Sequence, residues 1–342
     1  MVEMNPTADE GFAPLLIKDV VRETADTVSL VLDVPAGHAD RFRYRAGQFL
    51  TLAVTVNGEE HRRCYSMSSW PGTECALRIT IKRDRDGIVS NWLNDHVEPG
   101  QQIHAAPPEG RFVLTESERE LVAFAGGSGI TPVYSLIRHT LANTGRKARL
   151  FYANRNAESV IFDSALTDVL DTHIDRLTVH HHLDEQHGVV SADHLTTFLK
   201  DAGDAEFYIC GPAPFMDAVE SNLLDSGVPP ERIHLERFSV APIEVDASAP
   251  VLTEEVTIEL GREKVTAPYR AGHTLLQIAR LAGLKAPSSC ETGSCGTCIA
   301  QVTEGTARML NNDALDDDEV AEGLVVTCQA LPTSRSVRVV YE

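Results

Sequence analysis

Short runs of alternating apolar and polar residues dominate the first hundred or so positions of the chain. The runs SLVLDV, QFLTLAVTV and LRITIKR carry alternating or β-branched apolar residues, and Gly, Pro and Asn-Gly turns separate them. Runs of this length and composition are typical of β-strands. Many short strands with few helices predict a barrel or a sandwich for this part of the chain.

From Glu120 onward the pattern changes to strands that alternate with helices. The apolar runs ELVAFAGG, KARLFYANR and EFYICGP have strand length. Each precedes an amphipathic run of helical length, namely TPVYSLIRHTLANTG, FDSALTDVLDTH and APFMDAVESNLLDSG. Buried strands that alternate with amphipathic helices predict an α/β domain built on a parallel sheet.

The stretch APIEVDASAPVLTEE has no hydrophobic period and is rich in Pro, Ala, Ser and acidic residues. We expect a linker here, over residues 241–254. Beyond it, the runs EVTIEL, KVTAPY, TLLQIARLAG, IAQVTEG and SVRVVYE predict strands and a helix. They indicate a small α+β domain over residues 255–342.

Length and charge narrow the class of protein. At 342 residues the chain can form two or three hydrophobic cores. Its formal net charge of −20 argues against a nucleic-acid partner, because phosphate would be repelled. No apolar run approaches the roughly 20 residues that span a bilayer, and the first residues are acidic. We therefore expect a cytoplasmic protein without membrane insertion.

Three of the seven cysteines lie within the nine residues CETGSCGTC. Cys290, Cys295 and Cys298 have the spacing C-x4-C-x2-C, and Cys328 follows after 29 residues. This is the plant-type [2Fe–2S] ligand pattern, in which four thiolates hold two iron atoms. The alternatives are a zinc site and two disulfides. Zinc favours two C-x2-C pairs and only one is present, while disulfides are rare in long chains without an export signal.

The stretch RRCYSMSS resembles the R-x-Y-S signature of the ferredoxin-NADP reductase superfamily, carried here by Arg63, Tyr65 and Ser66. The resemblance implies a flavin-binding antiparallel β-barrel over residues 12–112. In it the arginine neutralises a flavin phosphate, the tyrosine stacks on the flavin ring, and the serine lies near the reactive nitrogen. An ordinary strand end is the alternative for so short a pattern.

The stretch DGIVSNWL resembles the G-x-x-S element of the same superfamily, in Gly87 and Ser90. We expect Ser90 to cap the helix NWLNDHV, whose free N–H groups would face a pyrophosphate. FMN has no pyrophosphate, so this element favours FAD. A capped surface helix is the alternative.

The stretch AGGSGITP closes the apolar strand LVAFA and resembles the superfamily's G-G-x-G-x-T-P loop, which holds the pyrophosphate of the nicotinamide cofactor. The matching residues are Gly126, Gly127, Gly129, Thr131 and Pro132. Glycines let the backbone approach phosphate closely, and a helix N-terminus supplies N–H donors. The resemblance implies a nicotinamide-binding domain over residues 113–240.

The stretch YICGPAPFM resembles the superfamily's C-G-P element, in Cys210, Gly211 and Pro212. The resemblance places Cys210 beside the nicotinamide, where the hydride passes. Taken alone, it would be a buried strand cysteine. Phe238 matches the aromatic residue that often closes over the flavin, with a packing role as the alternative. Ser66, Cys210 and Phe238 are therefore the expected catalytic residues.

Charged residues that follow two of the predicted strands bear on the choice between NADH and NADPH. Arg155 could clamp a 2′-phosphate, or equally meet an adenosine ribose or solvent. Asp184 and Glu185 would repel such a phosphate, so we expect NADH rather than NADPH. The run His180 to His182 precedes these acids. Neighbours on a strand face opposite sides and cannot all bind one metal, so we expect structural histidines.

The four signatures follow the order of the superfamily, and the resemblance covers the chain from about Phe12 to Glu342. It implies an NAD(P)H:acceptor oxidoreductase in which electrons pass from NADH to FAD, to the [2Fe–2S] cluster, and to an external acceptor. The chain is most similar to the reductase components of bacterial steroid 9α-hydroxylase and phenylacetyl-CoA epoxidase. A terminal oxygenase is therefore the expected partner, a Rieske-type steroid hydroxylase before a di-iron epoxidase.

Some alternatives stay open at this point. The acidic run 313–323 could dock an oxygenase or merely begin a short helix. The C-terminal module could be a passive or zinc-stabilised domain attached to a free flavin reductase. A nitric-oxide-detoxifying flavohaemoprotein shares the reductase domains, but it needs a globin domain before them.

Overall fold

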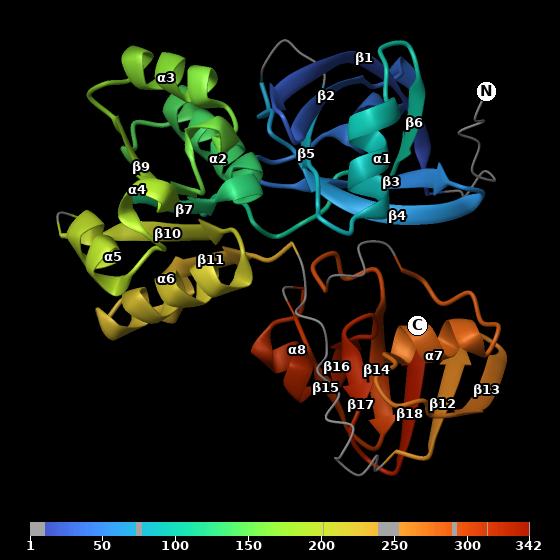
Figure 1. Ribbon diagram of the computed structural model, residues 1–342. Coiled ribbons are helices and arrows are strands. Elements are labelled where there is room, and N and C mark those ends of the chain that lie inside the picture. Colours follow the sequence, from blue (N-terminus) through green and yellow to red (C-terminus); the bar gives the residue numbers. More distant parts are fainter. Residues whose placement is uncertain are drawn as a thin grey trace. The chain divides into compact units, whose positions relative to one another are not determined.

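The computed structural model describes residues 11–72, 77–200, 202–238, 253–288, 293–312 and 314–341. The chain divides into two compact units, Met1–Arg237 and Phe238–Glu342, and each is described by itself (Figure 1). Within the described ranges, no helix is long and apolar enough to cross a membrane.

An antiparallel sheet of six strands opens the first unit. Its strands are β1 (Ala13–Thr24), β2 (Thr27–Asp33), β3 (Phe49–Val56), β4 (Glu59–Ser66), β5 (Leu77–Lys82) and β6 (Gln102–Ala105). They lie in the order β4-β3-β6-β1-β2-β5. Just beyond β4, Ser68 N donates to Arg78 O at 2.8 Å, so the chain from one edge strand meets the other edge strand. The sheet thereby closes into the predicted barrel rather than a sandwich.

Alternating side chains fill the barrel. Leu15 and Ile17 of β1 and Leu30 and Leu32 of β2 are fully buried in one cluster. Helix α1 (Ile88–His96) belongs to the same core through its buried residues. Strand β4 has the sequence EEHRRCYS, whose polar positions do not form a strand pattern. Its eight residues pair one by one with β3, so tertiary pairing rather than patterning makes it a strand.

The second sheet of this unit is parallel. Its strands are β7 (Glu120–Gly126), β8 (Ala148–Asn154), β9 (Leu177–Leu183), β10 (Ala205–Cys210) and β11 (Ile233–Glu236), in the order β11-β10-β7-β8-β9. The helices are α2 (Ile130–Asn143), α3 (Asp163–Thr172), α4 (Asp184–His187), α5 (Ala192–Leu199) and α6 (Ala213–Asp225). Apolar residues of α2 and α3 pack in one core and those of α5 and α6 in another, on opposite faces of the sheet (Figure 1). The predicted α/β domain is confirmed.

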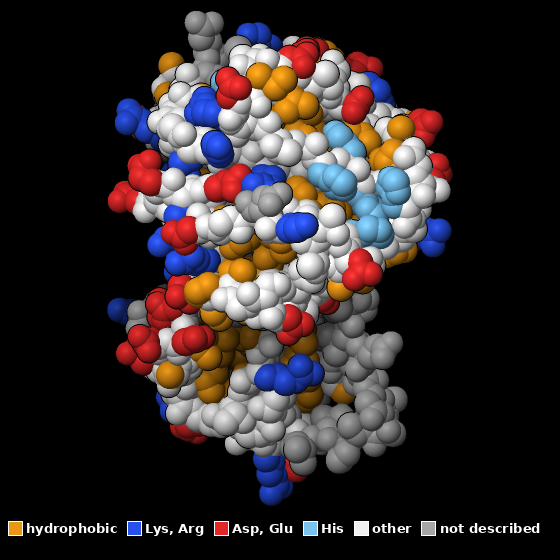
Figure 2. Space-filling view, turned by 90° about the vertical axis from the view of Figure 1, so that its left-hand side faces the viewer, with side chains coloured by type: hydrophobic (Ala, Val, Ile, Leu, Met, Phe, Trp, Pro, Cys, Tyr) orange, Lys and Arg blue, Asp and Glu red, His pale blue; other side chains and the backbone are white. Residues whose placement is uncertain are grey.

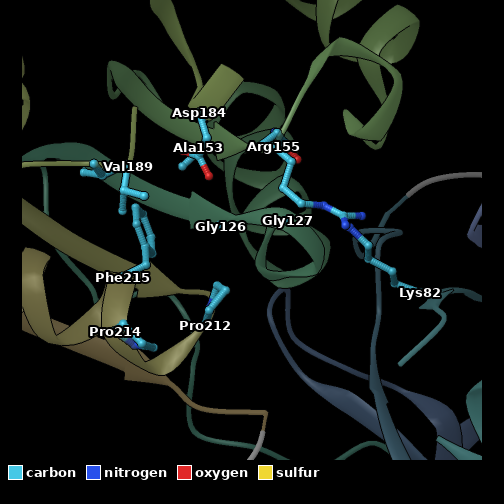
Figure 3. Close-up of a pocket in the computed structure, with 12 residues that line it drawn as sticks. Lys82, Gly126, Gly127, Ala153, Arg155, Asp184, Val189, Pro212, Pro214 and Phe215 are labelled. Carbon is cyan, nitrogen blue, oxygen red and sulfur yellow. The ribbon is translucent and has the colours of Figure 1, made fainter. Parts of the chain in front are cut away.

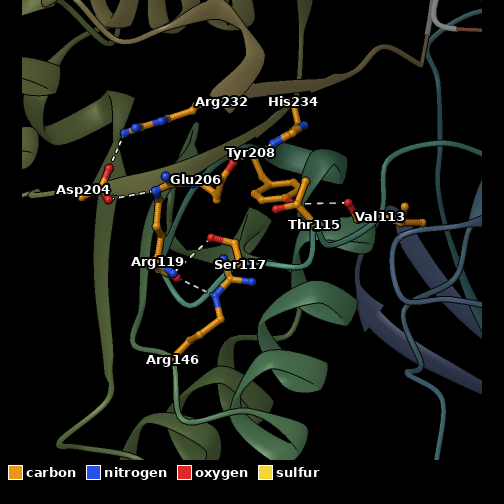
Figure 4. A network of polar contacts seen from close by, with 10 residues as sticks. All are labelled: Val113, Thr115, Ser117, Arg119, Arg146, Asp204, Glu206, Tyr208, Arg232 and His234. Atoms are coloured by element: carbon orange, nitrogen blue, oxygen red, sulfur yellow. Dashed lines mark hydrogen bonds and ion pairs between the residues drawn. The ribbon is translucent and has the colours of Figure 1, made fainter.

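A polar network fixes the connection between barrel and parallel sheet (Figure 4). The backbone N–H of Thr115 donates to the Tyr208 hydroxyl at 3.0 Å, and that hydroxyl donates to Val113 O at 3.3 Å. Arg119, at the end of the connection, donates to the nearly buried Glu206 at 2.8 Å. The connecting segment is therefore held by β10, the strand that ends at Cys210.

The second unit is built on a mixed sheet. Its strands are β12 (Glu255–Leu260), β13 (Glu263–Pro268), β14 (Ile299–Glu304), β16 (Leu324–Val326) and β18 (Ser336–Tyr341), in the order β13-β12-β18-β14-β16. Helix α7 (Leu275–Leu281) buries its apolar face in the same core. The remaining elements are the strand pair β15 (Ala307–Met309) and β17 (Ala330–Pro332) and the short helix α8 (Asp317–Ala321). Strands β12 and β18 are parallel, the other strand pairs of this sheet are antiparallel, and helix α7 packs on it, so the unit is the predicted α+β domain.

Four short 3-10 turns complete the described elements: η1 (Ala36–Phe42), η2 (Gly127–Gly129), η3 (Ala157–Ser159) and η4 (Pro230–Arg232).

Candidate functional site

A cavity lies at the carboxyl edge of the parallel sheet (Figure 3). Strands β7, β8 and β10 run parallel and end at this edge, at Gly126, Asn154 and Cys210. Because β8 and β10 flank β7 on opposite sides, the strand order reverses here, which is where ligands bind in open α/β sheets. The cavity has a volume of about 320 Å³.

The glycine-rich loop and the C-G-P element interlock at this edge. A Cβ atom added at Gly129 would lie 2.0 Å from the backbone oxygen of Cys210. One added at Gly126 would lie 2.8 Å from Cδ of Pro212, and one added at Gly211 would lie 3.0 Å from the backbone N and Cα of Gly126. These glycines are required because two backbones, far apart in sequence, pass within van der Waals contact. The structure thus brings together two motifs that the sequence shows separately.

Thr131 and Pro132 lie in the first turn of α2 and are buried. The Thr131 hydroxyl donates to Ser128 O at 3.0 Å and so holds the loop that precedes the helix. Gly127 has a φ of +52°, a conformation that favours glycine, and lines the cavity. Thr131 and Pro132 therefore support the conformation of this loop. Their predicted contact with a cofactor stays a prediction.

Asn154 supports a ligand in this cavity. Its side chain is buried and lines the cavity. It lies near enough to the Tyr152 hydroxyl to lower the pKa of that phenol, against the larger effect of burial, which raises it. Neither Oδ1 nor Nδ2 of Asn154, however, forms a hydrogen bond within the described structure. A buried amide without hydrogen bonds is costly, so a polar ligand that fills the cavity would satisfy it. This amide therefore fits a polar ligand, of which a nicotinamide dinucleotide is one.

Charged side chains from both sheets line the same cavity. Arg155 and Asp184 follow β8 and β9, whereas Lys82 comes from the barrel strand β5. Burial lowers the pKa of Lys82, and the neighbouring Asp26 raises it in part. Sequence reasoning missed Lys82 and Asp26. Lys82 ends the strand LRITIK, shortly before Gly87, and this position in the sequence could have pointed to it.

The R-x-Y-S residues end strand β4 of the barrel. Arg63 is exposed and donates to Arg62 O at 2.7 Å, while Ser66 is buried. Tyr65 packs against the barrel core, and burial raises the pKa of its hydroxyl well above the ordinary value. An exposed cation, a half-buried aromatic ring and a hydroxyl in four consecutive residues fit the chemistry that a flavin requires. Their individual roles stay predictions.

The predicted cap at Ser90 is wrong. Helix α1 begins at Ile88 with Gly87 as its N-cap, so Ser90 lies inside the first turn. Its Oγ accepts from Asp84 N at 3.1 Å. A Cβ added at Gly87 would lie 2.2 Å from that Oγ, so the glycine leaves the space that the serine hydroxyl occupies. The G-x-x-S spacing therefore shapes the loop before the helix rather than capping it.

Three of the four predicted cluster ligands lie in the described part of the second unit. Cys298 and Cys328 are buried, and Cys295 is half-buried. Thr327 joins two of these segments, because its N–H and its hydroxyl donate to Cys298 O at 3.1 and 2.8 Å. Cys290 lies outside the described residues. Within those residues no group of three or more His, Cys, Asp and Glu side chains is placed to hold a metal, so the ligand set stays a prediction.

The loop around these cysteines fits a cluster. Gly293 and Gly296 have φ values of +88° and +77°, and a Cβ at Gly293 would lie 2.8 Å from Asn311 O. The N–H of Thr297 donates to Sγ of Cys295 at 3.4 Å. Left-handed glycines and an N–H directed at sulfur are what a tightly wrapped iron–sulfur loop requires.

A buried hydroxyl chain supports this loop. The Tyr341 hydroxyl donates to Thr327 Oγ1 at 2.9 Å, and Thr327 Oγ1 donates to Cys298 O. Burial raises the pKa of Tyr341 to about 12, so its hydroxyl stays protonated and remains a donor at neutral pH. Sequence reasoning gave no role to this tyrosine.

Two predicted catalytic residues have contrasting positions. Cys210 is fully buried at the end of β10, beneath the glycine loop. Phe238 is 38% exposed and is the first residue of the second unit. Its predicted closure over the flavin stays a prediction.

Histidine side chains gather on one face of the first unit, shown in pale blue in Figure 2. The rings of His180 and His182 stack on Phe151, whereas that of His181 contacts Tyr152. The predicted alternation of faces along β9 is confirmed. His182 is buried beside His194, with ring centroids 4.7 Å apart.

Comparison with known families separates three parts of the chain. Residues 14–114 match the family model of the oxidoreductase FAD-binding domain, and residues 124–221 match that of the oxidoreductase NAD-binding domain. Residues 258–333 match the 2Fe-2S iron-sulfur cluster binding domain.

Curated relatives are similar over nearly their whole length. The ferredoxin reductase component of 3-ketosteroid-9-alpha-monooxygenase from Mycobacterium tuberculosis is 40% identical over 341 residues, covering 96% of this chain and 95% of that protein. One of the subunits of 1,2-phenylacetyl-CoA epoxidase from Escherichia coli is 33% identical, covering 97% and 98%.

A solved structure shares the three-part architecture. Phthalate dioxygenase reductase, described as a modular structure for electron transfer from pyridine nucleotides to [2Fe-2S], has a TM-score of 0.66 and 27% identity, covering 97% of this chain and 98% of that one. The chain is an oxidoreductase with FAD-binding, NAD-binding and [2Fe–2S] domains. It belongs to the family of oxygenase reductase components that includes the ferredoxin reductase component of 3-ketosteroid-9-alpha-monooxygenase.

Proposed function

We propose that this protein carries electrons from NADH through FAD and a [2Fe–2S] cluster to a terminal oxygenase, and that the oxygenase is a Rieske-type steroid 9α-hydroxylase. The observation that carries the proposal is the interlock of Gly126 and Gly129 with Cys210 and Pro212, at a cavity shared with the barrel residue Lys82. A hydride can pass only between two ring systems that such a junction holds together.

The residues of the chain bind and orient, whereas the cofactors supply the redox chemistry. When bound, FAD accepts two electrons as a hydride and passes them singly to the cluster. We propose that Arg63, Tyr65 and Ser66 hold the flavin ring and phosphate, that the loop at Gly87 holds the pyrophosphate of FAD, and that the loop at Gly127 holds the pyrophosphate of the nicotinamide cofactor. Cys210, buried beneath the glycine loop, lies next to the reacting nicotinamide in this proposal.

The four cysteines of the second unit hold the cluster in this proposal. Cys290, Cys295, Cys298 and Cys328 are the proposed ligands. The bend at Gly293 and the bond from Thr327 to Cys298 O keep the loop folded around them. We propose an FAD-binding barrel over residues 12–112, a nicotinamide-binding domain over 113–240, a linker over 241–254 and a ferredoxin domain over 255–342, with Phe238 near the end of the nicotinamide-binding domain.

We propose NADH rather than NADPH as the donor. Asp184 lines the cavity, and Glu185 N donates to Arg155 O at 3.0 Å, so two acids lie close to the arginine that would hold a 2′-phosphate. The Arg155 guanidinium already approaches Asp26 at 3.7 Å. A 2′-phosphate would therefore meet a site that already contains negative charge.

The steroid hydroxylase is the preferred partner because the identity to a steroid monooxygenase reductase, 40% over 96% of this chain, is the higher of the two identities. The second candidate partner is a di-iron epoxidase, favoured by the 33% identity to the protein of the phenylacetyl-CoA epoxidase system. We also propose a cytoplasmic location, since thiolate ligands and NADH both require a reducing compartment.

The test is anaerobic reduction by NADH, followed by transfer to purified oxygenase components. We expect NADH to bleach the flavin and to produce the electron paramagnetic resonance signal of a reduced [2Fe–2S] cluster. The reduced protein should then reduce the steroid oxygenase faster than the epoxidase. A Cys298→Ser variant should keep NADH-ferricyanide activity, which needs only the flavin, and lose oxygenase reduction. Stoichiometric zinc without a cluster signal would instead identify a free flavin reductase with a passive C-terminal module.

A further inference from the structure

Asp26 lies in the turn between β1 and β2, and hydroxyl groups hold one of its carboxylate oxygens. Thr24 Oγ1 donates to Asp26 Oδ1 at 2.7 Å, and Thr27 Oγ1 donates to the same oxygen at 3.1 Å. The other oxygen, Oδ2, is the one that approaches cations. The orientation of the carboxylate is therefore fixed by its own turn.

Two cations of the cavity approach Asp26 Oδ2. Lys82 Nζ lies 3.8 Å from it and Arg155 Nη2 lies 3.7 Å from it. Lys82 ends barrel strand β5 and pairs with Thr27 of β2, whereas Arg155 follows β8 of the parallel sheet. Figure 3 shows the side chains of Arg155 and Lys82 extended toward each other. Asp26 thus joins a cation of the barrel to a cation of the parallel sheet.

The two cations serve different parts of a dinucleotide. A Cβ added at Gly127 would lie 3.7 Å from Lys82 Nζ, so Lys82 faces the glycine loop, where a pyrophosphate binds. Arg155 follows the strand next to β7, the position that contacts the 2′ side of the adenosine ribose in such sheets. One carboxylate therefore stands beside both phosphate-binding cations.

Asp26 is charged at neutral pH. Burial works to raise the pKa of its carboxyl, but the hydroxyl of Thr24 and the charge of Lys82 lower it, with smaller effects of Thr27 and Arg155. The net result is a pKa below the ordinary value of 3.8.

We infer that Asp26 is a specificity-determining residue whose carboxylate competes with dinucleotide phosphate for Lys82 and Arg155, and so selects against a dinucleotide that carries a 2′-phosphate. NAD⁺ brings only its pyrophosphate and can leave the Asp26–Arg155 pair in place. NADP⁺ brings further negative charge to Arg155 and must either break that pair or lie beside the carboxylate. The inference rests on the proposed function only in that the cavity takes a nicotinamide dinucleotide.

The expected effect follows from Coulomb's law. Two unit charges roughly 7 Å apart, at an effective dielectric of roughly 40, change a dissociation constant about five- to tenfold. Removal of the Asp26 charge should therefore lower the dissociation constant of NADP⁺ about tenfold. That of NAD⁺ should fall less, because the pyrophosphate is common to both dinucleotides and only NADP⁺ brings a further phosphate to Arg155.

The experiment compares Asp26→Asn with Asp33→Asn in the full-length, flavin-loaded protein. Asparagine keeps the size of Asp26 and still accepts hydrogen bonds from Thr24 and Thr27, so the turn is retained. Asp33 is exposed at the opposite end of β2, about 20 Å along the strand, and controls for the loss of one negative charge. Dissociation constants for NAD⁺ and NADP⁺ are measured by calorimetry at low and high salt, and thermal unfolding checks the fold.

A double-mutant cycle with Arg155→Gln separates this mechanism from a general charge effect. We expect the NADP⁺ gain of Asp26→Asn to disappear in the Arg155→Gln background. An equal gain for both dinucleotides, no gain, or a gain that survives the loss of Arg155 would overturn the inference. Failure of the proposed function would look different, because the wild-type chain would then bind neither dinucleotide or would show no cluster reduction by NADH.

Discussion

Gly129 lies directly against the backbone of Cys210, so a single methyl group added at Gly129 should have a large effect on hydride transfer. Gly129 has a φ of −60° and a ψ of −12°, which any residue adopts, so alanine would not strain the backbone at this position. Its Cβ, however, would lie 2.0 Å from Cys210 O, 2.3 Å from Cys210 C and 2.7 Å from Gly211 N. All three contacts are with backbone atoms, which cannot move aside as a flexible side chain can.

The size of the effect follows from these distances. A carbon–oxygen contact needs roughly 3 Å or more, so the glycine loop and the end of β10 must separate by about 1 Å. A displacement of about 1 Å at a reacting centre costs about 100-fold in rate. Overpacking of a buried site should also lower the free energy of unfolding by roughly 1–3 kcal/mol. Gly129→Ala should therefore slow hydride transfer about 100-fold, an increase in activation free energy of about 2.7 kcal/mol, which is similar in size to the loss of stability.

The assay is stopped-flow reduction of the bound flavin by NADH, alongside urea unfolding. Gly145→Ala is the matched control, because a Cβ added at Gly145 meets no atom within 4 Å. The control should reduce its flavin at the wild-type rate. If Gly129→Ala also stayed within about twofold of wild type, the close approach of the two motifs would have no role in catalysis and the reasoning would be refuted.

Three further predictions concern the supporting networks. Tyr341→Phe removes the buried donor to Thr327 Oγ1, worth about 1 kcal/mol, so a chelator should extract the cluster about fivefold faster, followed by visible absorbance. Tyr208→Phe removes the hydroxyl bonded to Thr115 and should lower the free energy of unfolding by roughly 1–2 kcal/mol, measured in urea. Partial desolvation, then the neighbouring histidines, lowers the pKa of His180, which remains largely exposed, so a small part of the stability depends on its neutral form, is present above about pH 6.5 and is lost as the pH falls further. The melting temperature should therefore fall between pH 7 and 5.5, and His180→Gln should make it fall less.

Each of these predictions has an outcome that contradicts it. Tyr269→Phe removes a hydroxyl that accepts from Gly272 N elsewhere in the same unit, and equal cluster loss in that variant would deny Tyr341 a specific role. An unchanged urea midpoint in Tyr208→Phe would show that the connecting segment is held by other bonds. A His180→Gln variant whose melting temperature falls between pH 7 and 5.5 as much as that of the wild type, or more, would contradict the sign derived for His180.

Several parts of this protein could be read directly from its sequence. The apolar runs predicted β2, β3 and β5 of the barrel, and the alternation of β7, β8 and β10 with helices predicted the parallel sheet. Strand β4 could not be found in this way, because EEHRRCYS has little apolar pattern and forms a strand through its pairing with β3. The start of α1 was also misplaced, since Gly87 rather than Ser90 is its N-cap.

The residues of the candidate site also divide into those that the sequence identified and those that it did not. The spacing of Cys290, Cys295, Cys298 and Cys328, and the short glycine and proline motifs, are properties of local sequence, because each motif needs a fixed conformation of a few consecutive residues. Those motifs by themselves therefore indicated which cofactors to expect.

Only the tertiary structure decided which separate motifs meet. The contact of Gly129 with Cys210, the approach of Asp26 to Arg155, and the bond from Tyr341 to Thr327 all join residues distant in sequence. Local patterns record only which face of a strand or helix is apolar. Strand order and the packing of the barrel on the parallel sheet arise from the burial of those faces together, and they determine which charges and hydroxyls lie within a few ångströms of one another.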